Sequence, residues 1–143
     1  MKNKKAFTLI ELLVVIAIIG LLATLSVLAL NNARAKSRDA KRVADIKQMQ
    51  TALELYFNDK QSYPTSSEIT TSIFSTSTNG TSTYMQVIPT SPNPQATACT
   101  GADVYTYTQD SAGASYSLNY CLEGNVGTIS GGELHTATNA ALY

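Results

Sequence analysis

The sequence predicts an α+β fold in which one long N-terminal helix packs on a small C-terminal antiparallel sheet. Three observations predict it. Residues 12–30 are an apolar run without a charge, and residues 31–60 continue with apolar side chains at steps of three and four. Residues 115–123 then alternate between apolar and polar side chains, which is typical of a half-buried strand. A chain of 143 residues is long enough for one compact domain and an appendage.

The first element, LLVVIAIIGLLATLSVLAL at 12–30, has the length of a membrane-spanning helix. Its nineteen residues span about 28 Å at 1.5 Å per residue, close to the thickness of the hydrocarbon core. A cleavable signal peptide is the alternative, and Ala-Arg-Ala at 33–35 offers a small-x-small site. The run is longer than the roughly 7–15 apolar residues of such a signal. Basic residues flank it on both sides, so charge does not set its orientation.

A carboxylate, Glu11, lies just before this run. An acid within a membrane helix costs roughly 2.5–3.5 kcal/mol at the bilayer centre, less near the interface, and usually has a partner. No Lys, Arg or His occurs between Phe7 and Leu30. Two interpretations stay open: Glu11 extends to the headgroups, or its partner is on another molecule or is an amine created by processing.

The stretch FTLIELLVVIAIIG, from Phe7 to Gly20, resembles the N-terminus of type IV pilins and of the pseudopilins of type II secretion. In that family a membrane peptidase cuts just before the Phe and methylates the new α-amine, and the Glu is retained for assembly. The resemblance implies a leader of residues 1–6, cleavage between Ala6 and Phe7, and an assembly role for Glu11. The family normally has Gly before the cut. Since Ala6 has the next smallest side chain, we expect cleavage to be tolerated.

Cleavage would create an amine at Phe7, four residues before Glu11. On a continuous helix this offset is about 6 Å along the axis, so we expect neither group to have a close partner in its own chain. A neighbouring copy displaced along a filament axis would bring its amine to this carboxylate.

The helix is expected to continue from Phe7 to about Asn58, because no Pro or Gly interrupts residues 21–63. Residues 7–30 form its hydrophobic half, and residues 31–60 form an amphipathic half. The apolar stripe of the second half consists of Ala40, Val43, Ile46, Met49, Leu53 and Tyr56. The charged residues that fall largely off this stripe are Lys36, Asp39, Lys41, Arg42, Asp45 and Lys47, with Lys41 and Asp45 spaced as an i, i+4 pair.

The end of the helix is set by Pro64, which disfavours a helical conformation for the residue before it. The segment Ala52–Pro64, ALELYFNDKQSYP, resembles the helix end that major pseudopilins and many pilins share.

Residues 61–143 are predicted to form a Ser/Thr-rich loop and a C-terminal β-sheet head. Thirteen of the nineteen residues at 65–83 are Ser or Thr, which predicts a surface loop, and Asn79-Gly80-Thr81 matches a glycosylation sequon. Strands are expected at Val104–Gln109, at Ser115–Glu123 and near Leu134. The middle strand should cover the helix stripe with Tyr116, Leu118, Tyr120 and Leu122, leaving Ser115, Ser117, Asn119 and Cys121 on the other face.

Cys99 and Cys121 are the only two cysteines. Beyond a membrane segment they would meet an oxidising space, where pairing is the default. Many pilins link the C-terminal part of the head in this way, so the predicted disulfide agrees with the resemblance.

The formal net charge of zero hides two opposite halves. All ten Lys and Arg lie in residues 1–60 beside five acids, whereas residues 61–143 hold five acids and no Lys or Arg. The balance argues against bulk affinity for nucleic acid or acidic lipid, and the asymmetry suggests a subunit that meets its own copies head to tail. The basic run from Arg34 to Lys47 contains acids and no aromatics, which favours a solvated or intersubunit helix face over a DNA-binding one.

Other chemistry finds little support. A hydrolase would need His135 as base with a serine and Asp103 or Asp110, but no ordered motif surrounds them. We expect His135 to be a surface residue. Major pseudopilins often bind calcium through acids of a C-terminal loop, but Asp103, Asp110, Glu123 and Glu133 lack the D-x-D type spacing.

The sequence therefore predicts a non-enzymatic filament subunit of the pilus or pseudopilus type, with no cofactor, metal or small-molecule substrate. Its expected partners are its own copies in a helical filament, a prepilin peptidase, the inner-membrane assembly machinery and, before assembly, membrane lipid. We expect a single-pass precursor in the cytoplasmic membrane and an extracellular or periplasmic filament. Two alternatives stay open: a membrane-anchored extracytoplasmic binding domain that never polymerises, and a tethered hydrolase.

Overall fold

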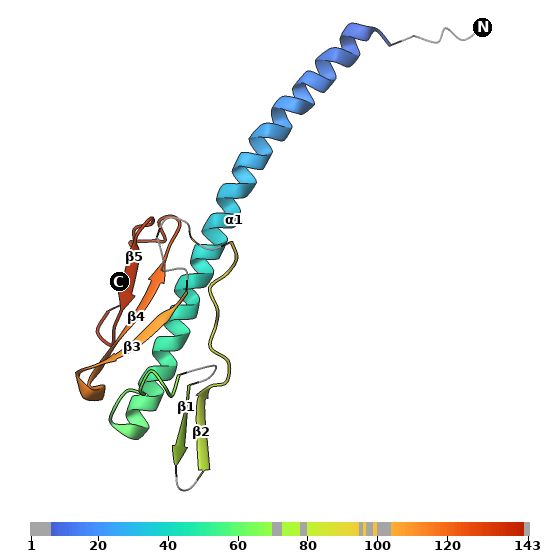
Figure 1. Cartoon of the computed structure of the whole chain (residues 1–143). Helices are drawn as coiled ribbons and strands as arrows, with labels where there is room; N and C mark the ends of the chain where they lie inside the picture. Colours follow the sequence, from blue (N-terminus) through green and yellow to red (C-terminus); the bar gives the residue numbers. More distant parts are fainter. Residues whose placement is uncertain are drawn as a thin grey trace. The chain divides into compact units, whose positions relative to one another are not determined.

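The computed structural model describes residues 7–69, 73–77, 80–94, 96, 99 and 104–141 (Figure 1). The chain divides into two compact units, residues 1–34 and residues 35–143. The leader at 1–6, Asn79 of the sequon and Asp103 lie outside the described residues.

Helix α1, Leu9–Lys60, contributes to both units and has 52 residues. Its bounds differ from the expected Phe7–Asn58 by two residues at each end. At its C-terminal end the N–H of Gln61 donates to the Phe57 carbonyl at 2.8 Å, and Gln61 takes the left-handed conformation with φ 58° that often ends helices. Among the described residues, α1 is the one helix long and apolar enough to cross a membrane.

The second unit contains a three-stranded antiparallel sheet in the order β3–β4–β5 (Figure 1). The strands are β3 (Thr106–Asp110), β4 (Ser115–Cys121) and β5 (Leu134–Ala137). A short 3-10 turn, Ser111–Gly113, joins the first two. In the registers, Thr106 pairs with Asn119 and Leu118 with Ala137. The three predicted C-terminal strands, and with them the α+β fold class, are confirmed.

The core of this unit lies between the sheet and the second half of α1. As predicted, β4 turns Tyr116, Leu118 and Tyr120 inward, and Leu122 follows them. They form one buried cluster with the helix stripe and three further residues, namely Val43, Ile46, Met49, Ala52, Leu53, Tyr56, Tyr63 and Ala137. The predicted stripe holds from Val43 onward, whereas Ala40 is exposed.

The expectation of a surface loop at 65–83 is wrong for most of its second half. Strands β1 (Ile73–Ser77) and β2 (Gly80–Met85) form an antiparallel hairpin in which Ser77 pairs with Gly80. Threonine is β-branched and favours extended backbone, so a Thr-rich segment does not need large apolar residues to form a strand. The Asn79-Gly80 dipeptide, typical of tight hairpins, was the available signal.

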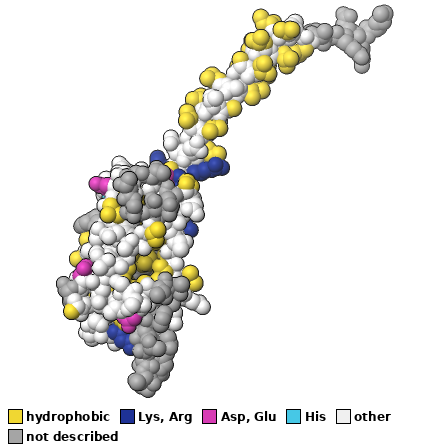
Figure 2. All heavy atoms as spheres, viewed as in Figure 1, with side chains coloured by type: hydrophobic (Ala, Val, Ile, Leu, Met, Phe, Trp, Pro, Cys, Tyr) yellow, Lys and Arg dark blue, Asp and Glu magenta, His cyan; other side chains and the backbone are white. Residues whose placement is uncertain are grey.

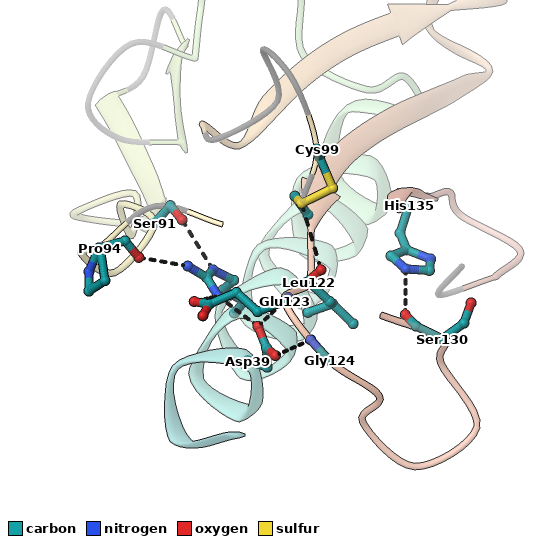
Figure 3. The surroundings of a disulfide bond; sticks show 11 residues. Asp39, Ser91, Pro94, Cys99, Leu122, Glu123, Gly124, Ser130 and His135 are labelled. Carbon is teal, nitrogen blue, oxygen red and sulfur yellow. Dashed lines mark hydrogen bonds and ion pairs between the residues drawn. A yellow bond between two sulfur atoms is a disulfide. The ribbon is translucent and has the colours of Figure 1, made fainter. Parts of the chain in front are cut away.

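Cys99 and Cys121 form a disulfide that joins the segment before β3 to the end of β4 (Figure 3). Both cysteines are buried and form a small cluster with Ala96, separate from the main core. This pairing agrees with the sequence-based prediction, and it places Cys121 on the face of β4 opposite the helix.

Candidate functional site

The first candidate site is the apolar half of α1. Its large hydrophobic side chains are exposed throughout the first unit, from 82% at Leu9 to 43% at Val15. Figure 2 shows them along the length of this part of the helix. Such a surface is far larger than the apolar patches that soluble monomers expose. It therefore needs a covering partner, either lipid or other protein.

Thr8 and Glu11 form a capping box at the start of α1. One Glu11 oxygen, Oε2, accepts hydrogen bonds from the Thr8 backbone N–H at 2.8 Å and from the Thr8 hydroxyl at 2.7 Å. In return, the Glu11 N–H donates to the Thr8 hydroxyl oxygen at 3.3 Å. This reciprocal arrangement satisfies donors that a helix N-terminus otherwise leaves unpaired.

The expectation that Glu11 lacks a partner in its own chain is therefore wrong. It assumed a helix running through Phe7, whereas α1 begins at Leu9 and the carboxylate bends back to Thr8. The partner is the neutral Thr8 and not a charged residue. The T-x-x-E spacing before an apolar run was the signal for it. Phe7 is 73% exposed, and Ala6 lies outside the described residues.

A second cluster, the ion network, lies inside the head. Arg42 is 1% exposed and donates to the Asp39 carboxylate at 2.6 Å and to Glu123 at 2.9 Å. Its other N–H groups reach the Ser91 hydroxyl and the carbonyls of Pro92 and Pro94. Arg38 binds Glu123 in a two-pronged contact at 2.8 and 2.6 Å.

Asp39 completes the ion network with backbone contacts. Its carboxylate accepts from the N–H of Glu123 at 3.0 Å and of Gly124 at 2.8 Å (Figure 3). Three segments distant in the sequence, the helix, residues 91–94 and residues 123–124, are thereby joined. Pairing of this kind is what makes burial of charged groups tolerable.

The prediction that charged residues fall off the buried stripe is wrong at three positions. Asp39, Arg42 and Asp45 are buried. Asp45 forms none of the described ion pairs, and therefore not the one expected with Lys41; it accepts a hydrogen bond from the Tyr105 hydroxyl at 3.0 Å. The helical pattern assigns apolar residues to the buried face and charged residues to the exposed face. It therefore misses charged residues that are buried because they are paired.

The possible calcium ligands are not gathered in one place. Glu123 belongs to the ion network, where hydrogen bonds from Arg38, reinforced by Arg42, hold its pKa below the ordinary 4.5. Asp110 ends β3, and Glu133 precedes β5 and accepts from the Ser130 hydroxyl. No group of three metal-ligating side chains occurs in the part of the chain that the structure describes.

His135 is buried, so the prediction of a surface residue is wrong. Its Nε2 lies 2.8 Å from the Ser130 carbonyl oxygen (Figure 3). Its ring packs on Tyr120 with centroids 5.3 Å apart. The alternation of β5 turns His135 and Ala137 inward. Neither of these two contacts brings a serine hydroxyl to the imidazole, so nothing in this arrangement supports a nucleophile–base pair.

Comparisons with known proteins agree with this picture. The family described as the prokaryotic N-terminal methylation motif matches residues 1–27. Type II secretion system core protein G of Escherichia coli (strain K12) is 41% identical over 66 residues, which cover 46% of each chain. The core protein G of Aeromonas hydrophila is 39% identical over 67 residues, covering 47% of each chain.

A pilin matches as well. Type IV major pilin protein PilA of Myxococcus xanthus (strain DK1622) is 36% identical over 61 residues, covering 43% of this chain and 28% of that protein. The chain spans about half the length of the secretion proteins it matches. No solved structure matches it significantly. With the methylation motif at its N-terminus, a long apolar helix and a small β-sheet head, the chain is similar to type IV pilins and pseudopilins.

Proposed function

We propose that this chain is a structural subunit of a type IV pilus or of a pilus-like pseudopilus filament. The observation that carries the proposal is the exposed apolar half of α1, at the N-terminus of a chain with the methylation motif. Lipid covers this surface in the precursor, and the same surface of neighbouring copies covers it in the filament. The heads then form the outer surface of the filament.

Processing is part of the proposal. A prepilin peptidase removes residues 1–6 by cutting between Ala6 and Phe7, and it methylates the new amine. The precursor is a single-pass protein of the cytoplasmic membrane, and assembly machinery in that membrane moves it into an extracellular or periplasmic filament. The exposed Phe7 next to the capped start of α1 is consistent with access to the bond before it.

Glu11 has the assembly role in this proposal. Cleavage creates a positive amine on each copy, and the Glu11 carboxylate of a neighbouring copy neutralises it inside the apolar filament core. The Thr8 cap complements this role, because it supplies hydrogen bonds to the carboxylate while the subunit is still alone in the membrane. Unsatisfied polar groups are costly in lipid.

Two measurements test the proposal. Mass spectrometry of the mature N-terminal peptide should find N-methyl-Phe7, and shearing of cells should release filaments that contain this chain. An intact Met1 or a start after residue 35 contradicts the processing step. A chain processed at Phe7 but never recovered in filaments would instead indicate the membrane-anchored binding domain.

A further inference from the structure

The solvent-facing side of α1 within the second unit carries a regular pattern of charge. We call it the outer face, and its exposed residues are Lys36, Ser37, Ala40, Lys41, Ala44, Lys47, Gln48, Thr51, Glu54, Leu55, Asn58 and Asp59. The side chains in its middle are uncharged, and charged side chains line its two flanks. With 3.6 residues per turn, positions eighteen apart lie on one line along the helix.

Each flank begins with a positive charge and ends with a negative one. Lys36 and Glu54 lie on the first flank and are eighteen positions apart; Lys47 lies between them on nearly the same line. Lys41 and Asp59, also eighteen positions apart, lie on the second flank. A second copy of this face, shifted along the axis, is therefore complementary to the first.

Among the described residues, these charges have no counter-ion within their own chain. Every ion pair among the described residues uses Arg38 or Arg42 as the cation. Glu54 and Asp59 are nevertheless held in place. Glu54 accepts a hydrogen bond from the Tyr63 hydroxyl and Asp59 one from the Tyr84 hydroxyl, both at 2.7 Å.

A hollow of about 470 Å³ opens on the first flank. Its lining residues are Lys47, Gln50, Thr51, Glu54, Tyr116 and residues 138–141. The Tyr116 hydroxyl is buried beside the Gln50 side chain, and no hydrogen bond of good geometry reaches it among the described residues. Burial raises the pKa of Tyr116 to about 12, so this hydroxyl keeps its proton. A buried hydroxyl whose hydrogen-bonding capacity is incompletely used is a suitable contact for a ligand in the hollow.

The polar groups that line the hollow indicate which kind of ligand it can bind. The Gln50 amide donates to the carbonyls of Thr138 and Ala141, which leaves its own oxygen as an acceptor. The Glu54 carboxylate and the Tyr116 hydroxyl oxygen add two more acceptors. A lysine ammonium, with three donors at the end of a slender chain, satisfies such a set.

We propose that the hollow receives Lys41 of a second copy of this chain, aligned parallel and shifted along the helix axis. Two parallel helices that face each other bring opposite flanks together. Lys41 on the second flank of one copy then faces Glu54 on the first flank of the other, thirteen positions further along. The shift is about 18–20 Å at 1.5 Å per residue.

The same shift produces a second ion pair. Lys47 and Asp59 are twelve positions apart and lie on opposite flanks, so they meet in the same arrangement. Between the flanks, the small side chains of Ala40, Ala44 and Thr51 allow the two helices to approach, and Leu55 offers an exposed apolar contact. The inference rests on the proposed function, because the shared membrane orientation of the copies is what makes them parallel.

Charge reversal in the full chain tests the inference. Lys41→Glu alone and Glu54→Lys alone should each lower the yield of sheared filaments by at least about tenfold, because like charges then face each other. The double variant restores the pair in reversed order and should recover most of the yield. The matched control is Lys36→Glu, whose shifted counterparts are the uncharged Gln48 and Met49, and its yield should stay normal.

Cross-linking tests the geometry independently. Copies with Lys41→Cys are co-expressed with copies carrying Glu54→Cys, and sheared filaments are treated with a short bismaleimide. Cross-linked dimers are expected in the mixture and in neither population alone. In a parallel experiment with copies carrying Lys41→Cys and copies carrying Asp59→Cys, cross-linked dimers would indicate antiparallel copies and overturn the inference.

The outcomes separate the two proposals. Normal filament yield from Lys41→Glu, with wild-type filaments present, overturns this inference and leaves the proposed function intact. Wild-type cells that process the chain but form no filaments contradict the proposed function, and the inference with it. Thermal unfolding of each variant in detergent checks that these exposed substitutions leave the head folded.

Discussion

Arg42 has an unusual position for a charged residue, because it is almost completely buried and all five of its N–H donors are used. Removing such a cation leaves Asp39, itself 1% exposed, without its counter-charge. Breaking a buried pair in this way typically costs about 3–5 kcal/mol. The head should therefore depend strongly on this one side chain.

Arg42→Met tests this dependence. We expect the free energy of unfolding of the head, measured by urea titration of the full chain in detergent, to fall by about 3–5 kcal/mol. Lys41→Met is the matched control, since Lys41 is exposed, and it should change stability by less than about 0.5 kcal/mol. Equal midpoints for the two variants would show that the network contributes little.

Glu123 gives the same network a pH dependence. Its pKa in the folded chain lies below the ordinary 4.5, chiefly because Arg38 donates to it. Stability from this contact is complete above about pH 4.5 and is lost as the pH falls through the folded value. The melting temperature should therefore drop less steeply on acidification in Glu123→Gln than in wild type. Parallel curves down to about pH 3 would contradict this.

Glu11 combines two functions that a single substitution can separate. Glu11→Gln keeps a side chain that can complete a capping box but removes the charge, whereas Glu11→Val removes both. We expect both variants to be inserted and cleaved yet scarce in filaments, by more than about tenfold, because the amine of a neighbour is left unpaired. Co-expression with wild type should rescue each variant partly.

A different result would assign the assembly role to the capping box at the start of α1. If Glu11→Gln assembled normally and only Glu11→Val failed, the capping box with Thr8 rather than the charge would be what assembly needs. Filament yield after shearing, normalised to the amount of cleaved subunit, distinguishes the two cases.

Among the elements, the segment before β3 depends most on a covalent link. The Cys99–Cys121 disulfide closes a loop with a sequence separation of 22. For loops between 15 and 100 residues the chain-entropy model gives roughly 3–4.7 kcal/mol. Replacing both cysteines with Ser should lower the stability of the head by a few kcal/mol in urea titrations, and membrane insertion should be unaffected. Two alkylatable thiols in the native protein would contradict the bond.

The elements differ in how well sequence reasoning predicts them. Helix α1 and strand β4 follow from hydrophobic periods of 3.6 and 2, which are local properties of the chain. The β1–β2 hairpin has no apolar alternation, so composition alone suggested a loop. The burial of His135 depends on which face of β5 turns inward, and a four-residue strand is too short for its pattern to decide this.

The ion network was not predictable from periodicity for a related reason. Arg42 reaches residues 91–94 and Glu123, which the sequence places about fifty and eighty positions away. Its partners are backbone carbonyls as well as carboxylates. Because every residue has a backbone carbonyl, the residue types do not indicate which carbonyl will bind Arg42. The Thr8 cap, in contrast, lies within four residues and was readable from the T-x-x-E spacing.

At the scale of the whole molecule, the division into two units predicts separate stability. Every residue of the main buried cluster lies between Val43 and Ala137, inside the second unit. Residues 35–143 expressed alone should therefore fold cooperatively and melt within a few degrees of the full chain. Circular dichroism measures this. A fragment that stays unfolded would show that the head needs the apolar half-helix.

Such a fragment should also fail to enter filaments, since it lacks the exposed apolar surface. Sedimentation of co-expressed fragment and full chain after shearing separates stability from assembly. Fragment recovered in the pellet at the level of the full chain would mean that the heads alone drive association.

The Arg42 cluster has one more consequence. Two carboxylates, two backbone carbonyls and a hydroxyl surround the guanidinium, and this is the oxygen set that proteins commonly offer to a calcium ion. Here the cation at its centre is tethered to the backbone, so neither dilution nor a chelator can extract it. The ion network of this head therefore forms as the chain folds, whatever the divalent-ion content of the surrounding medium.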